Sequence, residues 1–127
     1  MQRFEIQKRF EAEEALNVLN ANIDKIRYVK EWANLSGCSK SKLNNIIKTI
    51  YHVTPKELLR KERLKKIEEV IIAHPKMTSY AVAVECGLRN DKNLYKFLKI
   101  NFDTTFTDLK FCLIWEDKLL DLNRKNS

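Results

Sequence analysis

Two stretches of the chain carry lysine and asparagine at helical spacing, each opposite a stripe of apolar residues. The polar residues are Lys40, Ser41, Asn44, Asn45 and Lys48 in the first stretch, and Lys92, Asn93, Tyr95, Lys96 and Lys99 in the second. An asparagine amide can form two hydrogen bonds with adenine, and lysine can donate to guanine or neutralise phosphate. These residue types suit nucleic-acid binding, and we expect both polar sides to face outward.

Each polar side requires a helix whose opposite side is buried. The apolar stripes are Leu43, Ile46, Ile47 and Ile50 in the first helix, and Leu94, Phe97, Leu98 and Phe102 in the second. Ser39 has the side-chain oxygen needed to cap the first helix, and either Asn90 or Asp91 can cap the second. The spacing therefore predicts two amphipathic helices.

The region around these helices is duplicated. The matched pairs are Ala33 and Ala83, Gly37 and Gly87, Leu43 and Leu94, and Leu58 and Leu109. The offset changes from 50 to 51 after the glycines because the second turn is one residue longer. Glycine can leave a helix through positive φ without steric cost. Each copy therefore reads as a short apolar helix, a glycine turn and a polar helix, which is the outline of a helix-turn-helix unit.

A long helix is predicted between the two copies. Thr54, Pro55 and Glu57 form a capping-box pattern with proline at the first helical position, and Pro75 cannot continue a helix. The stripe that can bind both halves is Leu58, Leu59, Ile67, Val70 and Ile71. A helix of about twenty residues, from Pro55 to the residues before Pro75, measures roughly 30 Å. This is close to the roughly 34 Å between successive major-groove openings of B-DNA.

The composition favours an all-α protein of about seven helices. The 127 residues include only two glycines and two prolines, far below ordinary usage. We expect one DNA-binding domain over 1–127, with an N-terminal extension and first helix-turn-helix unit (1–54), a linker helix (55–74), a second unit (75–110) and a C-terminal helical extension (111–127). A first helix is expected over about 4–22, and another includes Val29, Trp32, Ala33 and Leu35. Met77 is expected to lie in the first helix of the second unit.

Other classes of protein have little support. No signal peptide or membrane span is present, which favours a cytoplasmic protein without membrane association. The three cysteines have neither disulfide nor zinc spacing, and Cys38 and Cys86 are expected to fill core space. His52 and His74 have no paired cysteine or carboxylate motif, so we expect no catalytic residues, metal or cofactor.

The positive charge is concentrated in one segment. Residues 39–66 contain nine basic and two acidic side chains, whereas 1–38 and 67–127 are each balanced, so this segment carries the whole net charge of +7. Such a concentration is what a phosphate backbone attracts, although a solvated lysine-rich face would look the same. Residues 75–110 have a net charge of only +2, from six basic and four acidic side chains, so the second unit is expected to bind DNA more weakly.

The duplicated motif resembles the AraC/XylS family of bacterial transcription regulators. The resemblance rests on ANLSGCSKSKL (33–43), Ile47 and Lys48, LLRKERL (58–64), VAVECGL (82–88), Leu94, Leu98 and Lys99, and covers about residues 12–110. It is strongest to short members without a sensor domain. It implies two helix-turn-helix units on one asymmetric DNA site, commonly activating transcription through RNA polymerase.

The resemblance also implies roles for particular residues. The base-reading positions fall at Ser41, Asn44, Asn45, Lys92, Asn93 and Lys96, and the candidate backbone contacts are Lys40, Lys42, Lys48, Arg60, Lys61, Arg63, Tyr95 and Lys99. The first unit is expected to read A·T-containing steps, and the second to lean toward guanine. Two departures are His52 and Asp103, which replace glycines that often follow the recognition helices; both residue types tolerate the left-handed conformation. Arg27 and Tyr28 replace an apolar residue and a serine or threonine cap.

Apolar stripes extend beyond the matched region at both ends. They comprise Phe4, Ile6 and Phe10 at the start, and Phe111, Ile114, Trp115, Leu119 and Leu122 at the end. We expect them to pack back onto the body, which favours a monomer, with a dimer or partner surface as the alternative. Two other hypotheses remain: a protein-binding module that has lost DNA affinity, or the DNA-binding portion of a longer ligand-sensing regulator.

Overall fold

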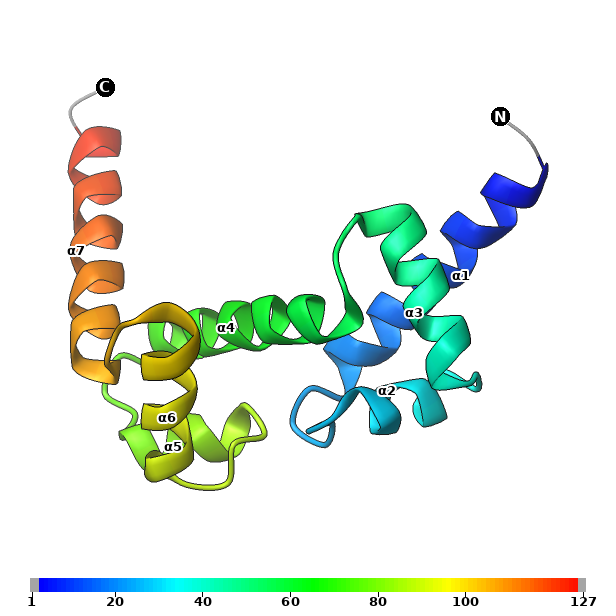
Figure 1. Ribbon diagram of the computed structural model, residues 1–127. Coiled ribbons are helices and arrows are strands. Elements are labelled where there is room, and N and C mark those ends of the chain that lie inside the picture. The colour runs from blue at the N-terminus through cyan, green and yellow to red at the C-terminus, as the bar shows by residue number, and fades with distance from the viewer. Residues whose placement is uncertain (1–2, 126–127) are drawn as a thin grey trace. The chain divides into compact units, whose positions relative to one another are not determined.

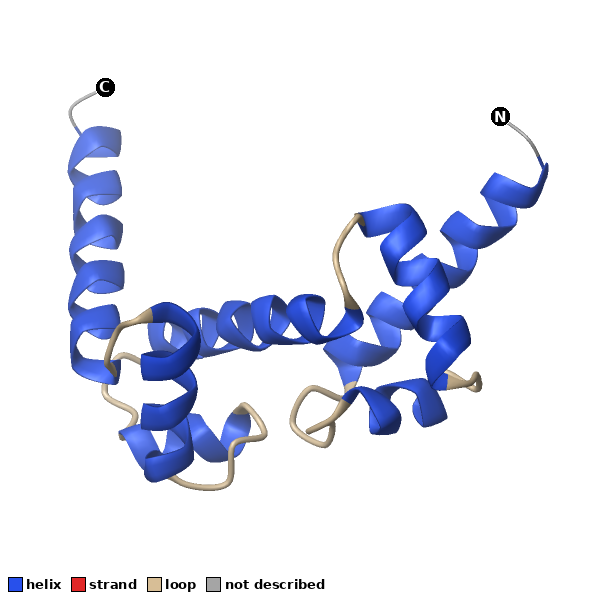
Figure 2. Cartoon of the chain, in the orientation of Figure 1, coloured by secondary structure: helices blue, strands red, loops and turns tan. Residues whose placement is uncertain are grey.

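All regular structure in the described part of the chain is helical (Figures 1 and 2). A computed structural model describes residues 3–125. Its seven helices are α1 (Arg3–Ala21), α2 (Val29–Leu35), α3 (Lys40–Tyr51), α4 (Pro55–Ala73), α5 (Ser79–Glu85), α6 (Asp91–Phe102) and α7 (Phe106–Lys125). This confirms the all-α prediction of about seven helices.

The chain divides into two compact units, residues 1–63 and 64–127. In the first, α1 packs against α2 and α3, and the start of α4 completes the core. The buried residues of this core are Ala15, Leu19, Ile23, Ile26, Trp32, Ala33, Leu43, Ile46, Ile47, Leu58 and Leu59. Trp32 is fully buried, and its indole Nε1 donates a hydrogen bond of 2.7 Å to the carbonyl of Ala15, which ties α2 to α1.

The second unit has a separate core. The second half of α4 meets α5, α6 and α7 around Ile67, Val70, Ile71, Val82, Ala83, Cys86, Leu94, Leu98 and Leu113. All five apolar residues predicted on α4 are buried, two in the first core and three in the second. Cys86 is fully buried and Cys38 packs at the edge of the first core, which confirms their apolar role. Leu113 was not predicted as core.

Side-chain caps begin most of the helices that form the two helix-turn-helix units. The Ser39 side chain accepts from the backbone N–H of Lys42, and the Asn90 side chain accepts from that of Asn93, so Asn90 rather than Asp91 is the cap. Thr78 caps α5, which places Met77 before the helix and corrects the prediction. At α2, Tyr28 stands in the cap position without a side-chain hydrogen bond.

Left-handed backbone occurs where α3 and α6 end and in the turn that precedes each of them. Gly37 has a φ of 73°, and His52 and Asp103 have φ values of 60° and 48°. The last two values confirm that His52 and Asp103 adopt the left-handed conformation that the sequence predicted these residue types to tolerate. Arg89 is also left-handed, at a φ of 73°, in the longer second turn; its conformation was not anticipated.

At Gly37 the free-energy cost of left-handed backbone for a residue other than glycine can be measured, because an added side chain would not clash with its surroundings. A Cβ added at Gly37 would meet no atom within 4 Å. Gly37→Ala is therefore expected to lower the free energy of unfolding by about 1 kcal/mol, through backbone strain alone. His52→Gly is the matched counterpart and should raise it by roughly 0.5 kcal/mol, because relief of strain outweighs the added unfolded-state entropy. Urea denaturation of both variants checks the pair. A Gly37→Ala protein as stable as the wild type, or a His52→Gly protein less stable than it, would contradict the prediction.

The apolar stripes at the two ends do not pack back onto the body. Phe4, Phe10, Phe111 and Trp115 are each more than half exposed, and Leu119 and Leu122 are also exposed. The packing prediction is therefore wrong for these side chains, which lie on sides of α1 and α7 that the cores of their units do not cover. None of the described helices combines the length and apolarity needed to cross a membrane.

Candidate nucleic-acid interface

The outer side of α3 carries the polar residues that the sequence placed there. Lys40, Ser41, Asn44, Asn45 and Lys48 are exposed, whereas Leu43, Ile46 and Ile47 are buried on the opposite side. The buried stripe fixes the rotation of the helix about its axis, because turning it would expose three large apolar side chains to water. The polar side of α3 is therefore a stable outward surface of the first unit.

An open groove of about 560 Å³ runs beside this surface in the first unit. Its lining residues are Arg27, Tyr28, Val29, Lys30, Lys40, Ser41, Asn44, Thr54, Pro55, Lys56 and Leu59. Four of them are cationic, and Ser41 and Asn44 of the polar side of α3 also line it. The groove thus joins positive charge to hydrogen-bonding side chains, a combination that suits an anionic, hydrogen-bonding partner.

Three cations of this groove were not among the sequence candidates. Arg27 and Lys30 flank the start of α2, and Lys56 lies in the first turn of α4. Lys56 belongs to the basic segment 39–66, which was a signal that could have identified it. Arg27 and Lys30 lie in a segment of balanced charge, so composition gives no such signal for them.

Arg63 is not part of this surface. Its side chain is only 4% exposed, and its guanidinium donates to the carbonyl of Ile23 at 2.9 Å and to that of Ile26. Both carbonyls lie in the loop between α1 and α2, whose backbone acceptors need a partner once buried. The prediction that Arg63 contacts the DNA backbone is therefore wrong. Its neighbour Arg60 is half-buried, and Lys61 is exposed.

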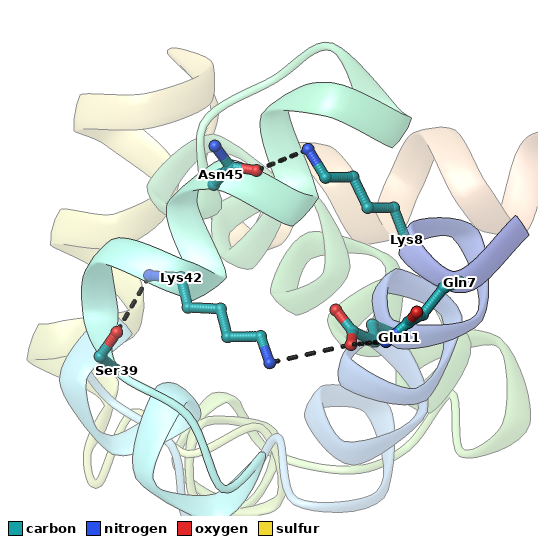
Figure 3. A network of polar contacts seen from close by, with 6 residues as sticks. All are labelled: Gln7, Lys8, Glu11, Ser39, Lys42 and Asn45. Atoms are coloured by element: carbon teal, nitrogen blue, oxygen red, sulfur yellow. Dashed lines mark hydrogen bonds and ion pairs between the residues drawn. The ribbon is translucent and has the colours of Figure 1, made fainter. Parts of the chain in front are cut away.

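Two side chains of α1 reach the polar side of α3 (Figure 3). Lys8 Nζ donates a hydrogen bond of 3.1 Å to Asn45 Oδ1, and Glu11 Oε1 lies 3.7 Å from Lys42 Nζ. Gln7 donates to the same Glu11 oxygen at 3.4 Å. Lys42 is therefore directed toward α1, and one of the two lone pairs of Asn45 Oδ1 is already engaged.

The second unit presents a similar polar side on α6. Lys92, Asn93, Tyr95, Lys96 and Lys99 are all exposed, as predicted. Two of them have partners within the unit: Asn93 Nδ2 donates to the carbonyl of Leu88 at 2.9 Å, and Lys99 Nζ lies 3.2 Å from Asp103 Oδ1. Asn93 therefore helps to hold the turn before α6, and Lys96 is more directly available to a ligand.

A thiol also lies near the α3 surface. Burial raises the pKa of Cys38, while the nearby charge of Lys42 lowers it and that of Glu11 raises it. The thiol is thus held in its neutral form, which is the less reactive one. Among the described residues, no group of three or more histidine, cysteine, aspartate or glutamate side chains is placed to hold a metal ion.

The fold has counterparts among solved structures, although no protein-family model and no curated protein matches the sequence. A transcriptional regulator from Chromobacterium violaceum, described as containing an AraC-type DNA-binding domain, is similar with a TM-score of 0.68 at 16% identity, over 85% of this chain and 96% of that one. A DNA-binding transcriptional dual regulator from Escherichia coli K-12 is similar with a TM-score of 0.65 at 19% identity, over 83% and 93%. At these identities the likeness establishes the fold, and the chain therefore has the all-helical architecture of an AraC-type DNA-binding domain.

Proposed function

We propose that the protein is a sequence-specific double-stranded DNA-binding regulator of transcription of the AraC type. In this proposal α3 and α6 enter successive major grooves of one site, and the bound protein activates transcription through contact with RNA polymerase. The observation that carries the proposal is the outer side of α3, where amide, hydroxyl and ammonium groups stand on a helix-turn-helix unit beside a cationic groove.

The residues of the first unit divide by chemistry into two roles. Ser41, Asn44 and Asn45 supply hydrogen bonds suited to base edges, whereas Lys40, Lys48, Lys56 and Lys61 supply charge suited to phosphates. Arg27 and Lys30 add charge from the start of α2. We assign the stronger hold on DNA to this unit, because the basic excess of the chain lies in 39–66.

The second unit is proposed to contribute specificity with less affinity. Lys92 and Lys96 can donate to guanine, and Tyr95 and Lys99 can approach phosphates. The ion pair with Asp103 offsets part of the charge of Lys99, and the bond to Leu88 engages one donor of Asn93. These two contacts reduce the positive charge and the number of free hydrogen-bond donors that α6 presents to DNA.

The salt dependence of DNA binding tests the proposal. Duplexes enriched from a random pool should bind much more tightly than scrambled duplexes. Their affinity should fall by about 10³-fold between roughly 50 and roughly 200 mM salt if about six phosphates are contacted. Fluorescence anisotropy across the salt range gives the slope. A chain that enriches no sequence, or whose binding barely responds to salt, would instead be a protein-binding module.

Two charge variants control this measurement. Lys48→Ala removes a cation from the proposed surface and should reduce the logarithmic salt slope by about 0.9, with equal weakening on every sequence. Lys118→Ala removes an exposed cation on α7, outside the proposed surface, and should leave the slope unchanged. Equal slopes for the two variants would place the DNA somewhere other than on α3.

A further inference from the structure

The ammonium group of Lys8 is held beside the recognition helix by two contacts. It lies 3.1 Å from Asn45 Oδ1 and 4.4 Å from the centroid of the Phe4 ring (Figure 3 shows the first). A cation over an aromatic face is attracted by the ring quadrupole. Phe4, although 64% exposed, therefore has a local role: it supports Lys8 in the position where Lys8 meets Asn45.

A second contact joins the same two helices within the first unit. Glu11 of α1 meets Lys42 of α3, three residues along each helix from Lys8 and Asn45. The separation of three residues places each pair of side chains on one face of its helix. Lys8 therefore approaches Asn45 through a two-point contact between α1 and α3.

This contact changes what Asn45 presents to a base pair. Adenine offers an acceptor at N7 and a donor at N6, and a free asparagine matches both through its oxygen and its amide N–H. With one of the two lone pairs of Oδ1 engaged by an ammonium group, the groups that Asn45 presents are mainly its two amide hydrogens, which are donors. Guanine offers two acceptors, N7 and O6. The Lys8–Asn45 pair thus complements guanine better than adenine.

We propose that Lys8, on the helix that precedes the helix-turn-helix unit, is a positioning and specificity-determining residue that makes Asn45 select guanine. The inference rests on the proposed DNA-binding function. It also reverses, at this one position, the A·T preference that Asn45 alone predicts. Because Lys8 acts through Asn45, its effect should be confined to the base that Asn45 reads.

Selection from a random duplex pool, followed by sequencing, tests the proposal with the whole chain. The wild type should enrich guanine at one position of the first half-site. Lys8→Met keeps the length of the side chain and removes its charge, and it should raise the adenine-to-guanine ratio at that position about tenfold. Asn45→Ala should abolish the preference there, and adding Lys8→Met to it should have no further effect on that base. Lys118→Met is the matched control and should reproduce the wild-type site.

The outcomes separate this inference from the function on which it rests. If Lys8→Met weakens binding to all sequences equally and leaves the selected base unchanged, Lys8 only neutralises phosphate and the inference fails while DNA recognition stands. If the wild type enriches no sequence, both fail. Phe4→Ala gives an independent check, because loss of the supporting ring should shift the same base in the same direction by a smaller factor. Circular dichroism of each variant establishes that these exposed substitutions leave the fold intact.

Discussion

Replacing Arg63 by alanine is expected to lower the free energy of unfolding by about 3 kcal/mol, a large effect for a residue in a lysine- and arginine-rich helix. The guanidinium is almost completely buried, at 4% exposure, and donates to the carbonyls of Ile23 and Ile26. Hydrogen bonds from a charged donor contribute more than neutral ones, and truncation leaves buried acceptors without these donors. Urea denaturation followed by circular dichroism measures the loss.

Arg60 provides the matched control, three residues earlier on the same helix. Its side chain is half-buried, so Arg60→Ala should cost less than about 1 kcal/mol. Arg63→Lys should recover only part of the loss, because lysine lacks the planar fork that serves two carbonyls at once. If Arg63→Ala unfolds at the same urea concentration as wild type but loses DNA affinity, the structural role is wrong and a phosphate-contact role is restored.

Much of the helical architecture could be predicted because it depends on local sequence patterns, namely the helical spacing of apolar residues and the residues at helix ends. Leu43, Ile46 and Ile47 repeat at the helical period and are all buried. Ser39 and Gly37 mark the start of α3 and the turn before it through their own backbone and side-chain chemistry. The outward residues of α3 and α6 followed from the same periodicity, since a buried stripe determines the opposite side as well.

What the sequence could not predict depends on contacts between distant segments. Arg63 is forty residues from Ile23, and Lys8 is thirty-seven residues from Asn45. The positive charge of these two side chains does not reveal which distant residue each one contacts. The groove likewise combines Arg27, Lys30 and Lys56 from segments that only the fold brings together. The exposed apolar faces near both ends were misjudged for a related reason: periodicity reveals an apolar stripe but does not say whether a partner covers it.

Truncating Trp32 to alanine should have the largest effect on the first unit, lowering its free energy of unfolding by about 4 kcal/mol. The indole is fully buried between elements of that core, and its Nε1 bonds to the carbonyl of Ala15. Truncation therefore creates a cavity and removes the bond between α2 and α1. Because α2 begins without a side-chain cap at Tyr28, this helix has less local support than α3 or α5, and its position relies more heavily on Trp32.

The other tryptophan of the chain makes a sharp control. Trp115 is 56% exposed on α7, where its ring is stacked on that of Phe111 with centroids 6.5 Å apart. Trp115→Ala should change stability by less than about 1 kcal/mol, since little buried area is lost. In the Trp115→Phe background Trp32 is the sole indole, so its fluorescence reports unfolding of the first unit directly. A Trp32→Ala protein with near-wild-type stability would mean that α2 is held by other contacts. A large loss of stability in Trp115→Ala would mean that the exposed stripe of α7 is covered in solution. Since the core of its own unit leaves Trp115 exposed, a second molecule of the protein would then be the expected partner.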